Sequence, residues 1–143
     1  MARTRGRGPV VGLLAAGLLL LANGTGAARQ DEKKEDPLRA SLLKLNGVTT
    51  EEAQTAKLRE LVKDKAAAKK AVAEAVKMMK EAKDEKPFNY NGSLIIGKAA
   101  HYLKDYDAAE KFYENGIELV SKLKSGTKMV SAYENLIDLY WDA

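Results

Sequence analysis

The sequence predicts an all-α protein made of antiparallel helix hairpins. Apolar residues recur every three or four positions through most of residues 37–141, which is the period of a helix with one buried face. Stretches such as 66–82 are also rich in alanine, lysine and methionine, which favour helices. Turn residues interrupt the periodic runs often enough to predict about five helices after an N-terminal leader.

Residues 1–28 are typical of a secretory signal peptide. Arg3, Arg5 and Arg7 form a positive start, and residues 10–22 form an apolar run followed by small residues suited to cleavage. This run of about 13 residues is shorter than the roughly 20 needed to span a bilayer. We therefore expect cleavage and export to the periplasm, the cell envelope or the exterior. An uncleaved leader would instead anchor the protein in a membrane.

Composition excludes several classes of chemistry. The formal charge is +4, but removing the three leader arginines leaves 21 basic against 20 acidic residues, a net +1 that does not argue for a nucleic-acid partner. The chain has no cysteine and one histidine, so disulfides, thiol catalysis and cysteine-ligated or histidine-rich metal sites are excluded. We expect no cofactor. The charged stretch 29–36 is predicted to be a disordered tail.

Residues 37–86 are predicted to form the N-terminal helices. Asp36-Pro37 supplies a cap and a first-turn proline, and Asn46-Gly47 stops the first helix. Thr49 and Glu52 then form a capping-box pattern.

The following stretch, 49–83, is read as two helices with a break near Asp64, although a single long helix is the alternative. Pro87 ends this part, because the residue before a proline avoids helical geometry.

Residues 87–143 are predicted to form a helix hairpin and the first helix of a following unit. Gly97 and Ala100 are small, so a neighbouring helix can approach closely, and Asp105 can cap the second arm. Ser125-Gly126 is expected to end that arm. The second arm is expected to bury an apolar stripe: Tyr106, Ala109, Phe112, Tyr113, Gly116, Ile117, Val120 and Leu123.

This part of the chain resembles the tetratricopeptide repeat, a two-helix unit with small and aromatic residues at fixed positions. The resemblance rests on Ile96-Gly97, on Tyr106, Ala109, Tyr113 and Gly116, and on Tyr133, Leu136 and Tyr140 of the next unit. Ala100 replaces a large residue, Lys104 replaces the turn glycine, and the period is 40 residues rather than about 34. The whole chain also resembles secreted helical-repeat proteins of planctomycete-type bacteria.

The resemblance implies a right-handed array whose first helices line a concave groove that holds peptide segments. By that analogy the candidate partner-binding residues are Asn91, Lys98, His101, Tyr102, Asn135, Asp138 and Trp141.

Other conspicuous residues have ordinary interpretations. His101 lacks a sequence-adjacent acid and nucleophile, so we interpret it as a packing or surface residue. The lysine-rich stretch 57–83 is interpreted as a solvated helix face, with contact to an acidic surface or lipid headgroups as the alternative. Met78-Met79 are interpreted as core filling. Asp105, Asp107 and Glu110 lack the loop pattern of a calcium site and are interpreted as caps and surface charges.

These observations favour a non-enzymatic, exported helical-repeat module that binds a protein or peptide. The alternatives are the N-terminal docking region of a larger exported enzyme and a membrane-anchored structural protein. The final helix would leave an apolar face partly uncovered, formed by Tyr133, Leu136, Tyr140 and Trp141. That face predicts a fragment of a longer array, self-association, or packing back onto the alanine-rich helix.

Overall fold

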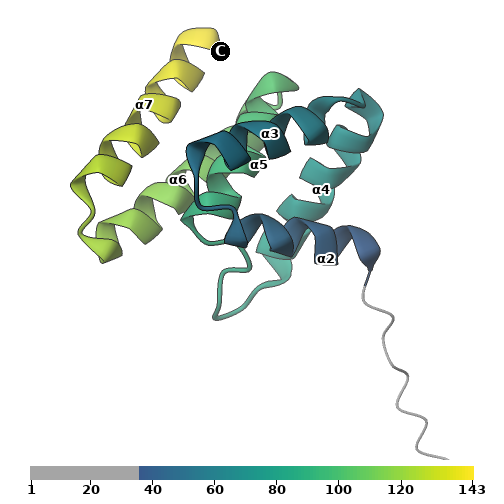
Figure 1. Ribbon diagram of the computed structural model, residues 1–143, viewed down its shortest axis with the longest axis horizontal. Helices are drawn as coiled ribbons and strands as arrows, with labels where there is room; N and C mark the ends of the chain where they lie inside the picture. Colours follow the sequence, from purple (N-terminus) through teal and green to yellow (C-terminus); the bar gives the residue numbers. More distant parts are fainter. Residues whose placement is uncertain (1–35) are drawn as a thin grey trace, which may run out of the picture. The chain divides into compact units, whose positions relative to one another are not determined.

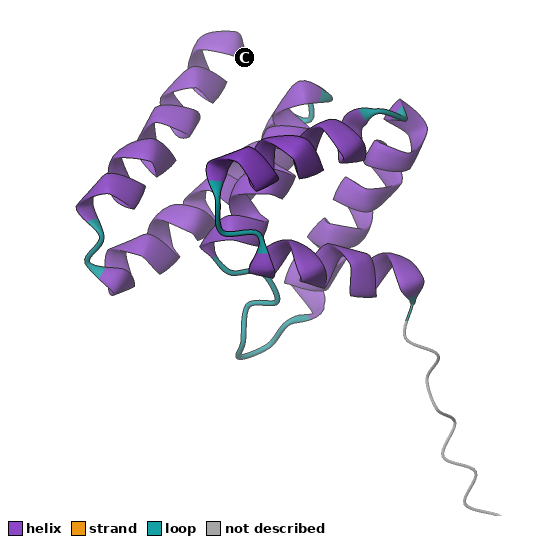
Figure 2. Cartoon of the chain, viewed as in Figure 1, coloured by secondary structure: helices purple, strands orange, loops and turns teal. Residues whose placement is uncertain are grey.

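The computed structural model describes residues 36–143, and these are helical with no strand among them (Figures 1 and 2). The described part contains six α-helices and one 3₁₀ helix, which confirms the all-α prediction. The predicted signal peptide, 1–28, and the predicted tail up to residue 35 lie outside the described residues. None of the described helices is both long enough and apolar enough to cross a bilayer.

Helix α2 (Pro37–Leu43) begins as the sequence predicts but ends earlier. The Asp36 carboxylate accepts a hydrogen bond from Leu38 N at 2.9 Å, and Pro37 occupies the first turn. The last residues tighten into the 3₁₀ helix η1 (Lys44–Gly47). Asn46 then joins η1 to a distant loop, because its Nδ2 donates to Pro87 O at 2.8 Å and its Oδ1 accepts from Asn89 N at 3.0 Å.

The stretch 49–83 forms two helices, α3 (Glu51–Val62) and α4 (Lys65–Glu81). Asp64 makes the break, since its Oδ1 accepts from Ala66 N and Ala67 N at 2.8 and 3.1 Å. The capping box is misplaced by one residue in the sequence prediction. Thr50, not Thr49, caps α3 by accepting from Ala53 N at 3.3 Å.

Helix α4 buries one stripe of small and flexible residues. That stripe consists of Ala68, Ala71, Val72, Ala75 and Met78. Met78 is buried and Met79 packs against the core, so the interpretation of these methionines as core filling is confirmed.

The hairpin of α5 (Tyr90–Tyr102) and α6 (Tyr106–Leu123) forms the centre of the described part. Gly97 permits the two helices to approach, because a Cβ at this position would stand 2.6 Å from the Tyr113 ring. Asp105 caps α6 by accepting from Ala108 N at 3.2 Å. The connecting Lys104 has a φ of 61°, a left-handed conformation that usually favours glycine.

The end of α6 differs from the prediction in two ways. The left-handed residue is Lys124, with a φ of 51°, whereas Gly126 is the first residue of α7 (Gly126–Asp142). Leu123 was expected to be buried but is 63% exposed. Helix α6 has 18 residues, whereas α5 has 13. The last turn of α6 therefore extends beyond the end of α5 (Figure 1).

Helix α7 packs along α6 and also reaches α5, rather than lying on the alanine-rich α4 (Figure 1). Only Ala132 and Leu139 are buried in it. Its large exposed apolar residues are Val130, Tyr133, Ile137, Tyr140 and Trp141. The expected uncovered face is therefore present, with Leu136 partly buried instead of exposed.

Candidate functional site: a groove between α5 and α7

A groove of about 570 Å³ lies where α5, α6 and α7 meet. Its lining residues are Leu58, Lys98, His101, Tyr102, Lys104, Tyr106, Tyr113, Asn135, Asp138 and Asp142. The α5 and α7 side chains form the walls, two tyrosines of α6 lie between them, and α3 adds a leucine.

Five of the seven candidate partner-binding residues line this groove. Lys98, His101 and Tyr102 come from α5, one helical turn or less apart, and Asn135 and Asp138 come from α7 at a spacing of three residues. Residues three or four apart share a helix face, which is why each helix presents its set to the same space.

The other two candidates lie elsewhere. Asn91 is only 8% exposed, and its Oδ1 accepts a hydrogen bond from Gln54 Nε2 at 3.2 Å, so it joins α5 to α3 inside the fold. Trp141 is 85% exposed and does not line the groove.

His101 connects the three helices at one end of the groove. Its Nε2 lies 2.9 Å from Asp142 Oδ2, and its Nδ1 lies 3.5 Å from the Tyr113 hydroxyl. The ring also meets the rings of Tyr106 and Tyr113 edge to face, at centroid distances of 6.2 and 6.3 Å. The Tyr106 hydroxyl donates to Asp142 O at 3.0 Å. The last turn of α7 is thereby held against the hairpin.

Burial raises the pKa of Tyr113 well above its ordinary value, and the carboxylate of Asp138 raises it further. Tyr113 therefore keeps its phenolic proton and donates it toward His101 Nδ1. The other ring nitrogen, Nε2, lies within hydrogen-bond distance of Asp142 Oδ2. This arrangement fixes the imidazole and the end of α7.

The sequence interpretation of His101 missed these partners. Asp142 is 41 residues away from His101, and no local spacing links them. The groove wall contains no serine or threonine, so the phenol of Tyr113 is the one hydroxyl within hydrogen-bond range of the His101 ring among the described residues.

The rest of the groove offers mixed recognition groups. Lys98 and Lys104 are basic, whereas Asp138 and Asp142 are acidic. Tyr102 is 65% exposed and presents an aromatic face at the edge. Asn135 donates through Nδ2 to Ser131 O in the preceding turn, which leaves its amide oxygen available to accept a hydrogen bond.

The acidic cluster of α6 has structural partners. Asp105 caps the helix, and Glu110 accepts a hydrogen bond from the Tyr140 hydroxyl. Within residues 36–143 no three histidine or carboxylate side chains lie close enough together to hold a metal ion.

No protein-family model, curated protein or solved structure matches this chain. The class that the described residues define is an all-α protein.

Proposed function

We propose that this protein is a non-enzymatic, exported helical-repeat module, tetratricopeptide-like in arrangement, that binds a protein or peptide segment in the groove between α5 and α7. One observation carries the proposal. Five of the seven candidate partner-binding residues, on two helices and 33 or more residues apart between them, line a single groove of about 570 Å³. Ligand-binding clefts commonly enclose about 300–1,000 Å³.

The chemistry of the groove suits an extended peptide. The exposed ring of Tyr102 gives an apolar surface with a polar tip, a combination enriched at binding interfaces. Asn135 can hydrogen-bond a peptide N–H through its free amide oxygen. Lys98 and Asp138 carry opposite charges on opposite walls, so a segment with both acidic and basic residues is preferred in one orientation.

The order of the helices supports the repeat interpretation. Helix α6 packs against α5 before it and α7 after it, as expected if α7 were the first helix of a second unit. Gly97 and Ile137 are equivalent by the 40-residue period. Gly97 is covered by the Tyr113 ring, whereas Ile137 is exposed because no second arm covers α7 in the described chain.

The test is selection of short peptides from a random library on the purified protein, followed by affinity measurements on variants. Asn135→Ala combined with Tyr102→Ala should weaken a selected peptide at least about tenfold, equivalent to about 1.4 kcal/mol. Glu134→Ala is the matched control, since Glu134 is the exposed neighbour of Asn135 on α7 and does not line the groove. Equal weakening by Glu134→Ala, or failure to select any peptide, contradicts the proposal.

The exposed face of α7 favours a second function, docking onto another protein surface or a second copy of this chain. Ile137, Tyr133 and Val130 stand on α7 at helical spacing with their side chains exposed, and contiguous exposed apolar patches commonly mark interaction sites. This face also suits the helical docking region of a larger exported enzyme. Sedimentation velocity tests self-association: a concentration-dependent dimer that Ile137→Lys abolishes supports it, and a monomer at all concentrations contradicts it.

A further inference from the structure

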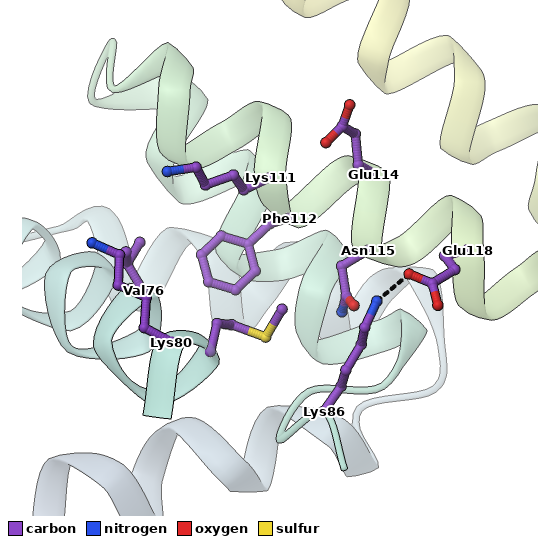
Figure 3. Close-up of a pocket in the computed structure, with 9 residues that line it drawn as sticks. Val76, Lys80, Lys86, Lys111, Phe112, Glu114, Asn115 and Glu118 are labelled. Atoms are coloured by element: carbon purple, nitrogen blue, oxygen red, sulfur yellow. Dashed lines mark hydrogen bonds and ion pairs between the residues drawn. The ribbon is translucent and has the colours of Figure 1, made fainter. Parts of the chain in front are cut away.

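A second cavity, of about 310 Å³, lies on the other side of α6, between that helix and α4 (Figure 3). Its apolar wall is formed by Val76 and Met79 of α4 and Phe112 of α6. Phe112 is 1% exposed and belongs to the main core, and Val76 and Met79 pack against that core. This cavity shares no lining residue with the groove between α5 and α7.

One wall of the cavity holds an unsatisfied hydrogen-bond acceptor. Asn115 is 3% exposed, and its Oδ1 has no hydrogen-bond partner. The orientation of the amide is fixed, because its other atom, Nδ2, donates to Ser93 Oγ at 2.7 Å and to the Phe88 carbonyl at 3.3 Å. A carbonyl can only accept, so the nitrogen must face Phe88 and the oxygen must face away. A buried acceptor without a donor costs about 1–3 kcal/mol, which a ligand N–H would recover.

Three lysines and two glutamates, Glu114 and Glu118, line the cavity, which leaves a formal excess of one positive charge. Lys80 and Lys111 line it, and no carboxylate among residues 36–143 forms an ion pair with either ammonium. Lys86 lines it too and pairs with Glu118 (Figure 3). Exposed pairs of this kind are weak, and Glu118 would keep a second partner, Lys122 at 3.0 Å, if Lys86 turned away.

We propose that this cavity binds a small N-acylated amino acid with an apolar side chain and a free carboxylate. The amide N–H of the ligand donates to Asn115 Oδ1, and its side chain packs on Met79 and Phe112. Its carboxylate lies among the three lysines and replaces Glu118 as the partner of Lys86. The ligand N–H thus matches the unpaired Asn115 oxygen, its side chain matches the apolar wall, and its carboxylate matches the lysines.

The test uses N-acetyl-L-leucine, titrated into ¹⁵N-labelled protein and followed by NMR. We expect saturable shifts of the backbone amides of Lys111, Phe112 and Asn115 and of the Asn115 side-chain amide. Two matched compounds separate the contributions. N-acetyl-N-methyl-leucine lacks the N–H donor and N-acetyl-leucinamide lacks the carboxylate, and each should bind at least about tenfold more weakly, as expected for one lost hydrogen bond or ion pair.

Surface variants keep the test independent of folding. Lys80→Gln with Lys111→Gln changes two exposed side chains and should weaken N-acetyl-L-leucine at least about tenfold. Lys69→Gln with Lys70→Gln, two exposed positions of α4 outside the cavity, should leave the affinity unchanged. The proposal is overturned if no saturable shift is seen, if the N-methylated compound binds equally well, or if the control pair weakens binding as much as the cavity pair. None of these outcomes depends on peptide binding in the other groove.

Discussion

The proposed repeat pairs α5 with α7, yet the environments of the two helices differ sharply. Helix α5 is buried along most of its length and contacts α3, α4, α6 and η1. Helix α7 buries only Ala132 and Leu139 and lies against α6 with a minor contact to α5. The same kind of amphipathic pattern therefore gives a core helix or a surface helix according to how many neighbours cover it.

Small side chains explain how α5 accepts so many neighbours. Gly97 lies under the ring of Tyr113, and Gly92 lies under the amide of Asn46. Ala99 and Ala100 are fully buried between larger residues. In α7 the corresponding surface is aromatic and branched, and no other helix among residues 36–143 covers its exposed face.

The largest expected effect comes from deleting one aromatic ring from the core around α5, Phe112 of α6, and one from the surface of α7, Trp141. Phe112→Ala should lower the free energy of unfolding by about 3–5 kcal/mol, because the ring is 1% exposed and contacts Phe88 edge to face at 5.8 Å. Trp141→Ala should change it by less than about 0.5 kcal/mol, because the indole is 85% exposed. Urea unfolding followed by circular dichroism measures both. Similar losses of unfolding free energy in the two variants would contradict the difference in burial between the core and α7.

The two helices should also respond differently to a methyl group. Gly97→Ala should destabilise the protein by about 1–3 kcal/mol, since the new Cβ would stand 2.6 Å from the Tyr113 ring.

Gly126→Ala is its counterpart in α7, where nothing lies within 4 Å of the new Cβ. It should stabilise the protein by about 0.4–1 kcal/mol, because alanine lowers the conformational entropy of the unfolded chain. The same unfolding experiment reports both values, and a stabilised Gly97→Ala variant would show that Tyr113 moves freely.

A smaller effect is expected at the turns that bound α6. Lys104 and Lys124 both adopt positive φ, which costs a residue with a side chain roughly 1–2 kcal/mol. Lys104→Gly and Lys124→Gly should therefore each raise the free energy of unfolding by up to about 1 kcal/mol. Lys111→Gly, in the middle of α6, should lower it by about 1 kcal/mol. Destabilisation by both turn variants would mean that the lysine side chains make contacts that outweigh backbone strain.

The smallest expected effect is electrostatic. Lys86, and to a lesser degree Lys122, lowers the pKa of the Glu118 carboxyl below its ordinary value. A lowered acid pKa stabilises the fold above the pKa of the unfolded chain, and this contribution is lost as pH falls through the lower, folded value. Lys86→Gln should raise the Glu118 pKa toward the ordinary value, and Lys122→Gln should raise it less. NMR titration of the Glu118 carboxyl carbon measures both shifts, and the reverse order would be inconsistent with the geometry.

Local physical chemistry made much of this fold predictable. Asp36 and Asp105 cap the helices that the sequence assigns to them, and Asp64 makes the expected break by capping α4. In each case a short acidic side chain reaches the free N–H groups directly after it. The close approach at Gly97 followed from the absence of a side chain.

The sequence predictions are wrong where contacts between distant helices determine the local structure. Two lysines adopt left-handed turns that glycine usually occupies, so no glycine marks the end of α6. Leu123 continues the apolar period but passes beyond its partner helix. The His101–Asp142 contact depends on how α7 docks, and a separation of 41 residues leaves no local signal for it. Asn91 was assigned to the groove by position in the repeat, but Gln54 of α3 covers it.

The most direct test of the central claim is to map where a selected peptide binds by ¹H–¹⁵N NMR. Binding in the groove predicts that the shifts concentrate at Lys98, Tyr102, Asn135 and Asp138 and reach saturation together. Shifts confined to Val130, Tyr133 and Ile137 would place the peptide on the exposed face of α7 and contradict the assignment of the groove.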